Sequence, residues 1–173
     1  DLAFLYMDFE YRGRADFAHV LLNAYLEATN DFHGLPLLRF YACCRAMIRC
    51  KVMALEAFEE EVPRETRAAA ANDARNYCAL AKRYAASSGA GAVILMCGPS
   101  GSGKSTVAKA FAARKGAVVM RSDAVRKHLA GLAPDEPGSG IYTPEITRRT
   151  YAFLIDEAKR IAPHGFTVVL DAT

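Results

Sequence analysis

Hydrophobic residues in the first third of the chain recur at three- and four-residue spacings, which is the period of an amphipathic helix. One such run begins at Leu2 and a second at Phe17, with Gly13 between them. A polar loop at 30–34 leads to a longer apolar pattern over about 37–58. The N-terminal region is therefore predicted to consist of helices alone.

An acidic run and Pro63 interrupt this pattern, and proline disfavours helix at the residue before it. The Ala-rich segment 64–86 follows without a break, so we predict a connecting helix there. The small residues of 87–91 are expected to form a flexible joint.

The pattern changes after this joint. Residues 92–97 are a continuous apolar run, which predicts a strand buried on both faces. Shorter apolar runs predict strands over 117–120 and 166–170. Helices are predicted over 104–114, over 124–132, and from Pro144 to about 162, with Thr143 as the N-cap. This alternation predicts an α/β region whose parallel sheet has three strands covered by helices.

Composition places the chain among globular proteins. Of 173 residues, 52% are hydrophobic and 24% are charged, which excludes a fibrous or disordered protein. No apolar stretch approaches the ~20 residues that cross a bilayer, so no membrane partner is expected. The net charge of +3 is spread along the chain and does not by itself imply a nucleic-acid partner, so none is expected. Five cysteines without a C-x-x-C pair or a secretory signal predict buried free thiols in the cytoplasm.

The motif with the clearest chemistry lies between the first predicted strand and its helix. Residues 98–105, GPSGSGKS, fit the phosphate-binding pattern G-x-x-x-x-G-K-[ST]. Its glycines let backbone N–H groups wrap around phosphate oxygens, and the helix N-terminus adds positive charge. Lys104 is expected on the β- and γ-phosphates and Ser105 on Mg²⁺. The predicted nucleotide-binding residues are Gly98, Pro99, Ser100, Gly101, Ser102, Gly103, Lys104, Ser105 and Thr106. No guanine-reading Asn-Lys-x-Asp is present, so ATP is favoured over GTP.

Two carboxylates follow the other predicted strands. Asp123 should lie at the phosphate side of the sheet, where it could accept a proton from a substrate hydroxyl, with Arg126 holding an anion. The alternative is that Asp123 only caps the next helix and Arg126 is solvated. Asp171 ends the third strand, the usual position of a residue that organises Mg²⁺, although a turn-forming aspartate is the alternative.

These segments resemble a known family. GPSGSGKSTVAKAFA, RSDAVRKHLAGL, GIYTPEITRRTYAFLIDEAKR and FTVVLDAT are similar to the AAA-type P-loop kinase half of bacterial proteins in which an aminoglycoside phosphotransferase-like half is fused to an ATP-binding kinase domain. That half is itself similar to gluconate kinases, zeta-toxin kinases and polynucleotide 5′-kinases. The resemblance implies that Asp123 is the base or an acceptor-binding residue, that Arg126 contacts the acceptor, and that Asp171 lies beside the metal or acceptor.

The resemblance also implies a domain organisation. Residues 1–62 would be the helical C-terminal part of the phosphotransferase-like domain, 63–90 a connecting helix and hinge, and 91–173 the N-terminal part of the kinase domain. The phosphotransferase loop H-G-D-x-x-x-x-N and the arginine-bearing lid are both missing. We therefore expect a fragment, partnered by flanking parts of its own chain, that binds nucleotide but is catalytically incomplete. A strand order of 2-3-1 would leave 92–97 as an uncovered edge.

The predicted function is an ATP- and Mg²⁺-dependent kinase that transfers the γ-phosphate to a hydroxyl acceptor, with a small molecule favoured. Lys104, Asp123 and Arg126 would be catalytic, and Ser105 and Asp171 would hold the metal. One alternative is a regulatory module that binds nucleotide without catalysis, although such a switch needs no acceptor base. Another is a nucleic-acid 5′-end kinase, which would require a basic groove near Arg126.

Overall fold

The computed structural model describes residues 2–86, 89–99, 101–133 and 136–172. Its contacts divide the chain into two compact units. The first, called the helical unit, comprises Asp1–Arg14 and Gly34–Ser87. The second, called the P-loop unit, comprises Ala15–His33 and Ser88–Thr173. Each unit has its own packing and is described by itself.

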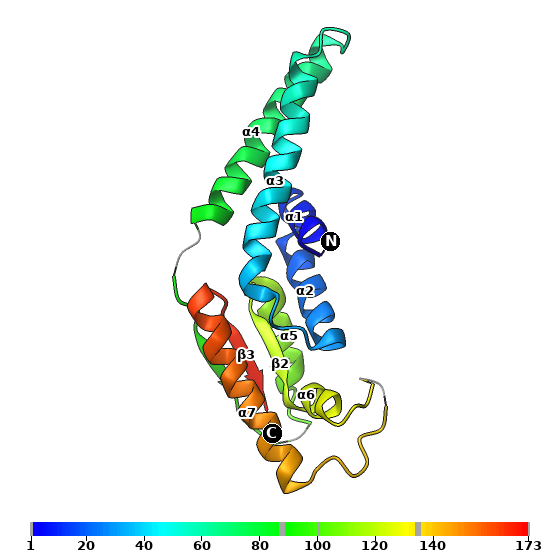
Figure 1. Ribbon diagram of the computed structural model, residues 1–173, viewed down its shortest axis with the longest axis vertical. Helices are drawn as coiled ribbons and strands as arrows, with labels where there is room; N and C mark the ends of the chain where they lie inside the picture. The colour runs from blue at the N-terminus through cyan, green and yellow to red at the C-terminus, as the bar shows by residue number, and fades with distance from the viewer. Residues whose placement is uncertain (1, 87–88, 100, 134–135, 173) are drawn as a thin grey trace. The chain divides into compact units, whose positions relative to one another are not determined.

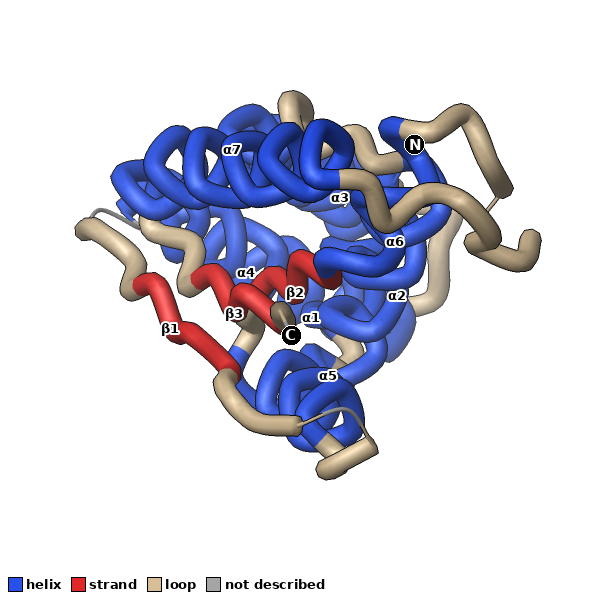
Figure 2. Tube along the Cα trace, turned by 90° about the horizontal axis from the view of Figure 1, so that it is seen from below, coloured by secondary structure: helices blue, strands red, loops and turns tan. Residues whose placement is uncertain are grey.

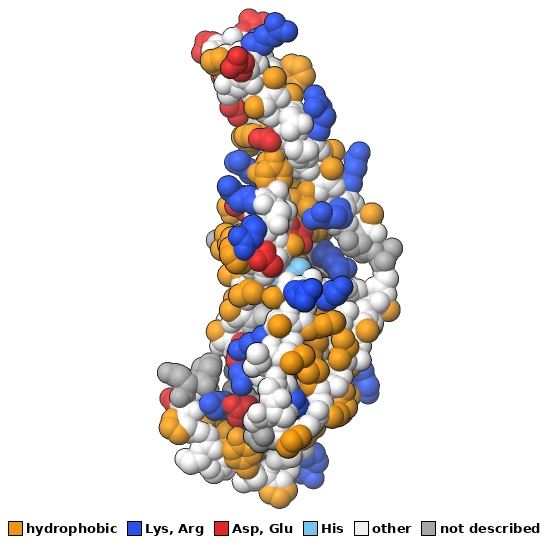
Figure 3. Space-filling view, turned by 180° about the vertical axis from the view of Figure 1, so that it is seen from behind, with side chains coloured by type: hydrophobic (Ala, Val, Ile, Leu, Met, Phe, Trp, Pro, Cys, Tyr) orange, Lys and Arg blue, Asp and Glu red, His pale blue; other side chains and the backbone are white. Residues whose placement is uncertain are grey.

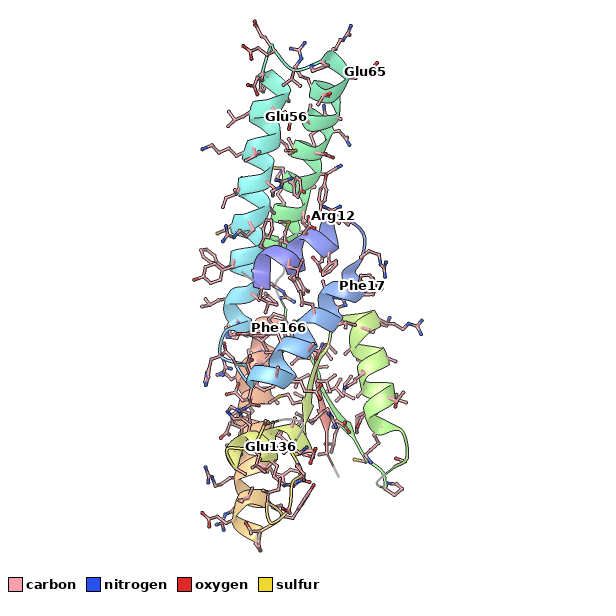
Figure 4. The ribbon with its side chains drawn as sticks, turned by 90° about the vertical axis from the view of Figure 1, so that its right-hand side faces the viewer. Arg12, Phe17, Glu56, Glu65, Glu136 and Phe166 are labelled. Atoms are coloured by element: carbon pink, nitrogen blue, oxygen red, sulfur yellow. The ribbon has the colours of Figure 1, made fainter. Side chains whose placement is uncertain are left out.

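The helical unit contains α1 (Leu2–Tyr11), α3 (Leu35–Phe58) and α4 (Arg64–Ala86). The helices α3 and α4 form a hairpin, and Glu56 and Glu65 lie near its closed end (Figure 4). Pro36 lies in the first turn of α3, where its missing N–H leaves no hydrogen bond unmade. The core joins small residues of α3 to larger ones of α1 and α4, namely Met7, Ala42, Ala46, Tyr77, Leu80, Ala81 and Tyr84. The predicted helices of this region are confirmed.

The sheet of the P-loop unit is parallel and has the order β1-β3-β2. Its strands are β1 (Val93–Met96), β2 (Val118–Arg121) and β3 (Val168–Asp171), and Val169 of the central strand is level with Ile94 and Val119. The helix α5 (Lys104–Lys115) covers one face and α7 (Pro144–Ile161) the other (Figures 1 and 2). The short helix α6 (Ser122–Leu129) follows β2 directly. The α/β fold and the 2-3-1 strand order are thus confirmed.

The strand β1 is not buried on both faces, as its apolar composition had predicted. Ile94 and Met96 pack against the core under α5. Val93 and Leu95, which alternate with them, are 51% and 62% exposed. The physical reason is position: β1 is an edge strand that pairs with β3 on one side, and α7, on the other face of the sheet, does not bury Val93 and Leu95. The predicted uncovered edge is therefore present.

Gly91, at the end of the predicted joint, is a fixed part of the P-loop unit. Its N–H donates to the carbonyl of Ala162 at 2.7 Å. A Cβ at this position would lie 2.0 Å from the carbonyl oxygen of Phe166, so only glycine allows this approach. Ser87 and Ser88, also assigned to the joint, lie outside the described residues.

The helix α2 (Ala15–Thr29) belongs to the P-loop unit, a placement that the sequence pattern did not predict. It runs beside α5 and β2 (Figure 4). The side-chain amide of Asn23 donates to the carbonyl of Ala117 at 2.9 Å and accepts from the N–H of Val119 at 2.7 Å. Asn23 thus satisfies backbone groups along the outer edge of β2, as a neighbouring strand would.

The structure bears on two predictions from composition, the lack of a membrane-spanning segment and the state of the cysteines. Within the described residues, no helix is long and apolar enough to span a membrane. All five cysteines are free thiols, as expected, but none is buried: four are half-buried and Cys97 is exposed.

Candidate functional site

The phosphate-binding loop joins β1 to α5. Gly103 is the N-cap of α5 and has a φ of +83°, a left-handed conformation that glycine adopts without strain. It has no side chain with which to cap the helix, so the first N–H groups of α5 are left for an anion. This local structure is what the motif predicted.

Lys104, the first residue of α5, folds back over the loop. Its ammonium donates to the carbonyl oxygens of Gly98 and Pro99, both at 2.7 Å. These contacts hold the cation at the mouth of the loop, where phosphate oxygens could replace the carbonyls as partners. Ser100, also predicted to bind nucleotide, lies outside the described residues.

Ser105 and Asp171 meet, as a shared metal-binding role requires. The Ser105 hydroxyl donates to Oδ2 of Asp171 at 2.6 Å. Asp171 is the last residue of β3 and is buried, and this hydrogen bond gives its carboxylate a partner on α5. A hydroxyl and a carboxylate are the hard oxygen ligands that Mg²⁺ prefers, and this cation commonly keeps several waters. The pair therefore fits the predicted metal.

One cavity of about 390 Å³ collects most of the predicted site. The loop and the start of α5 form one wall, and the ends of β2 and β3 with the start of α6 form the other. The lining residues are Gly101, Ser102, Gly103, Lys104, Ser105, Thr106, Arg121, Ser122, Asp123 and Asp171. Among the predicted nucleotide-binding residues, Gly98 and Pro99 do not line it but hold Lys104.

Asp123 is free of the capping role that was its alternative interpretation. The helix α6 begins at Ser122, one residue before Asp123, and its N-cap makes no side-chain hydrogen bond. Oδ1 of Asp123 instead accepts from the Tyr142 hydroxyl at 3.2 Å, and Oδ2 lies 3.8 Å from the Lys127 ammonium. The Asp123 carboxylate therefore faces the cavity and residues around it rather than the helix end.

Arg126 is not solvated, although solvation was its alternative interpretation. Its side chain is only 6% exposed. The guanidinium carbon lies 4.6 Å from the ring centroid of Tyr142, a cation–π contact. Its buried Nε has no hydrogen-bond partner among the described residues. Because buried polar groups are normally paired, this Nε, on an arginine one helical turn after Asp123, indicates a place for an anionic ligand. It does not line the 390 Å³ cavity itself.

Two charged residues near the cavity were missed by sequence reasoning. Arg121 at the end of β2 lines the cavity, and its Nη1 forms a short ion pair with Oε1 of Glu27 on α2. The available signal was the four-residue spacing of His19, Asn23 and Glu27, which puts three polar residues on one face of a largely apolar helix.

Comparison with known proteins supports the class of the C-terminal half. Residues 93–173 match the family model described as AAA domain. The whole chain is 33% identical over 178 residues to uncharacterized proteins of Mycobacterium bovis and Mycobacterium tuberculosis. The alignment covers all of this chain and 34% of each relative, so the chain spans about a third of their length. No solved structure gives a significant match. These findings agree with a P-loop domain of nucleotide-binding, kinase-like type, and the fusion to an aminoglycoside phosphotransferase-like half stays a prediction.

Proposed function

We propose that the chain is part of an ATP-dependent kinase that transfers the γ-phosphate to a hydroxyl group of a small molecule. The observation that carries this proposal is the single cavity in which Asp123 faces the phosphate-binding loop. A module that only bound nucleotide would need the loop but not a carboxylate opposite it. The activity is assigned to the intact protein, because the relatives are about three times as long.

The chain's own residues supply binding and orientation. The N–H groups at the start of α5 would hold phosphate oxygens, and Lys104 would leave its loop carbonyls for the β- and γ-phosphates. Ser105 and Asp171 would hold Mg²⁺. When bound, this cation neutralises charge that develops on the transferred group.

Asp123 would act on the acceptor. Its carboxylate accepts the proton as the acceptor oxygen attacks the γ-phosphorus and the bond to the β-phosphate oxygen breaks, so that ADP leaves. Before this step the acceptor hydroxyl must replace Tyr142 as the donor to Asp123. Arg126, buried under the Tyr142 ring, would hold negative charge on the acceptor side.

The test uses the full chain and the full-length protein. ATP affinity is measured by calorimetry, and phosphate transfer from labelled ATP is measured on sugars, nucleosides and short DNA ends. Lys104→Ala should weaken ATP binding by at least about tenfold, because it removes a charge-assisted contact. Asp123→Asn should keep ATP affinity and lower transfer by about 10² or more, the usual contribution of a general base.

Glu136→Gln is the matched control, since it neutralises an exposed carboxylate in the loop between α6 and α7, outside the cavity (Figure 4). Full transfer by Asp123→Asn would remove the base assignment. Unchanged ATP binding by Lys104→Ala would overturn the nucleotide site itself. ATP binding without transfer to any acceptor would favour the regulatory module, and preferential transfer to DNA ends would favour the 5′-end kinase.

A further inference from the structure

The helix α2 contacts the P-loop unit through three polar side chains one turn apart. His19 Nδ1 lies 2.9 Å from the carbonyl oxygen of Ala113 near the end of α5. Asn23 pairs with the edge of β2, as described above. Glu27, at the same four-residue spacing, reaches the far end of β2, where the phosphate cavity begins. Two of these contacts anchor the helix, and the third touches a residue of the cavity.

Glu27 contacts two cations. It forms the short ion pair with Arg121 Nη1, and its other oxygen lies 3.4 Å from the Lys109 ammonium. Both Glu27 and Arg121 are only about 30% exposed, so solvent screens their pairing less than that of a surface pair. Lys109 is more exposed and lies outside the lining of the phosphate cavity.

Arg121 lies between the two halves of the proposed site. Side chains alternate along a strand, so Arg121 shares the α5 face of the sheet with Val119. Its Nε is 3.9 Å from Oδ2 of Asp171, and its side chain lines the cavity with Lys104 and Asp123. The guanidinium contacts described for Arg121 involve Nη1 and Nε. Glu27 thus holds one nitrogen of the Arg121 guanidinium, while other N–H groups of the same side chain remain for a ligand.

We propose that Arg121 is a further phosphate-binding residue of this cavity and that Glu27 is the residue that positions it. The inference rests on the proposed nucleotide site. Arg121 would contact the terminal phosphate, because it lies beside Asp171, the expected metal ligand, and near the carboxylate expected to activate the acceptor. A planar guanidinium suits phosphate oxygens, which it can bind through two parallel hydrogen bonds. The helix α2 is then part of the nucleotide site.

The test is the difference between ATP and ADP affinities, measured by calorimetry on the full chain with Mg²⁺ present. Arg121→Gln and Glu27→Gln should each weaken ATP binding about tenfold and ADP binding less than about twofold, because only ATP has the terminal phosphate. Arg121→Lys should restore part of the preference for ATP. A role limited to stability would change the thermal midpoint but not the ratio of the two affinities.

Lys109→Gln is the matched control, because it removes the other cation beside Glu27 and should leave the ratio unchanged. The proposal is overturned if Glu27→Gln and Arg121→Gln keep the wild-type ratio. It is also overturned if Lys109→Gln changes the ratio as strongly as Glu27→Gln. Glu27→Asp gives a second variant should Glu27→Gln fail to fold, and it should fall between wild type and Glu27→Gln. A wild-type chain that binds neither nucleotide would instead contradict the proposed function.

Discussion

Glu10 of α1 accepts hydrogen bonds from two residues of α4 in the helical unit. Its Oε2 accepts from the Tyr84 hydroxyl at 2.6 Å and from Arg83 at 3.1 Å. Burial raises the pKa of Tyr84 above its usual range, and the hydrogen bond to Glu10 raises it further. Burial, then the hydrogen bond to Asp73, raises the pKa of Tyr11 to about 12. These two tyrosines stabilise the folded chain only while their phenols are protonated.

This arrangement predicts loss of stability at alkaline pH. In the unfolded chain the phenols ionise near pH 10, whereas in the folded chain their pKa values are higher. Their stabilising contribution is therefore complete below pH 10 and is lost as the pH rises through about 12. Urea unfolding of the helical unit, followed by circular dichroism from pH 8 to 11, should show a midpoint that falls above pH 10.

Tyr84→Phe is the control for this pH dependence. It removes an ionisable phenol and its bond to Glu10, so the variant should be less stable at pH 8 but should lose less stability on going to pH 11. An equal fall in both chains would contradict the role of Tyr84.

Residue roles were predictable where a motif fixes them. The motif at 98–105 predicted both the turn and the helix start, because its glycines can adopt the positive φ angles that this turn requires. Asp123 could be placed at the phosphate side of the sheet, but the alternative role of a helix cap depended on where α6 begins. Prediction put that start at residue 124 and the structure puts it at Ser122. Helix ends are the least predictable part of a helix, because caps and fraying change them by one or two residues.

At the scale of elements, hydrophobic period predicted helices and strands, but not which surfaces meet. The sequence indicated α2 as an amphipathic helix and assigned it to the helical region with its neighbours. Its placement in the P-loop unit depends instead on Asn23, His19 and Glu27. The four-residue spacing of these polar residues puts them on one face of α2, but it does not say which surface that face contacts, so this contact required the structure.

Removal of the Asn23 amide should destabilise the P-loop unit. Asn23→Ala leaves the Ala117 carbonyl and the Val119 N–H, both partly buried, without their partner. The expected cost is about 1–3 kcal/mol in the free energy of unfolding, the usual penalty for stranded polar groups. Thermal unfolding measures it. Thr29→Ala, an exposed change on the same helix, should cost less than about 0.5 kcal/mol, and an equal loss in both variants would contradict the role of Asn23.

At the scale of the whole molecule, large hydrophobic side chains are exposed in both units. Some lie on α3, where Phe40, Leu55 and Phe58 are exposed, and others on β1. Figure 3 shows one face on which hydrophobic side chains are exposed among Lys and Arg. Exposed apolar patches are sites at which proteins associate. Self-association of the isolated chain is therefore expected, and the edge strand is the place to reduce it.

Leu95→Lys should raise the monomer fraction in sedimentation velocity at a given protein concentration. A lysine on an edge strand opposes pairing with another strand, because charges would have to be buried together. Val107→Lys is the control, since Val107 is equally exposed, at 59%, but lies on α5 away from the strand edge. If both substitutions raised the monomer fraction alike, exposed apolar area rather than the strand edge would govern association.

The amide of Asn23 has a consequence for the form that such association takes. A fibre grows when each molecule offers two complementary strand edges, one to the copy before it and one to the copy after it. Here backbone groups of β2 are already bonded to Asn23, and β1 alone offers an open edge among the described strands. Two copies that pair through β1 would leave no open strand edge, so association would end at a two-fold symmetric dimer. One asparagine side chain would thus separate a closed dimer from an open-ended polymer.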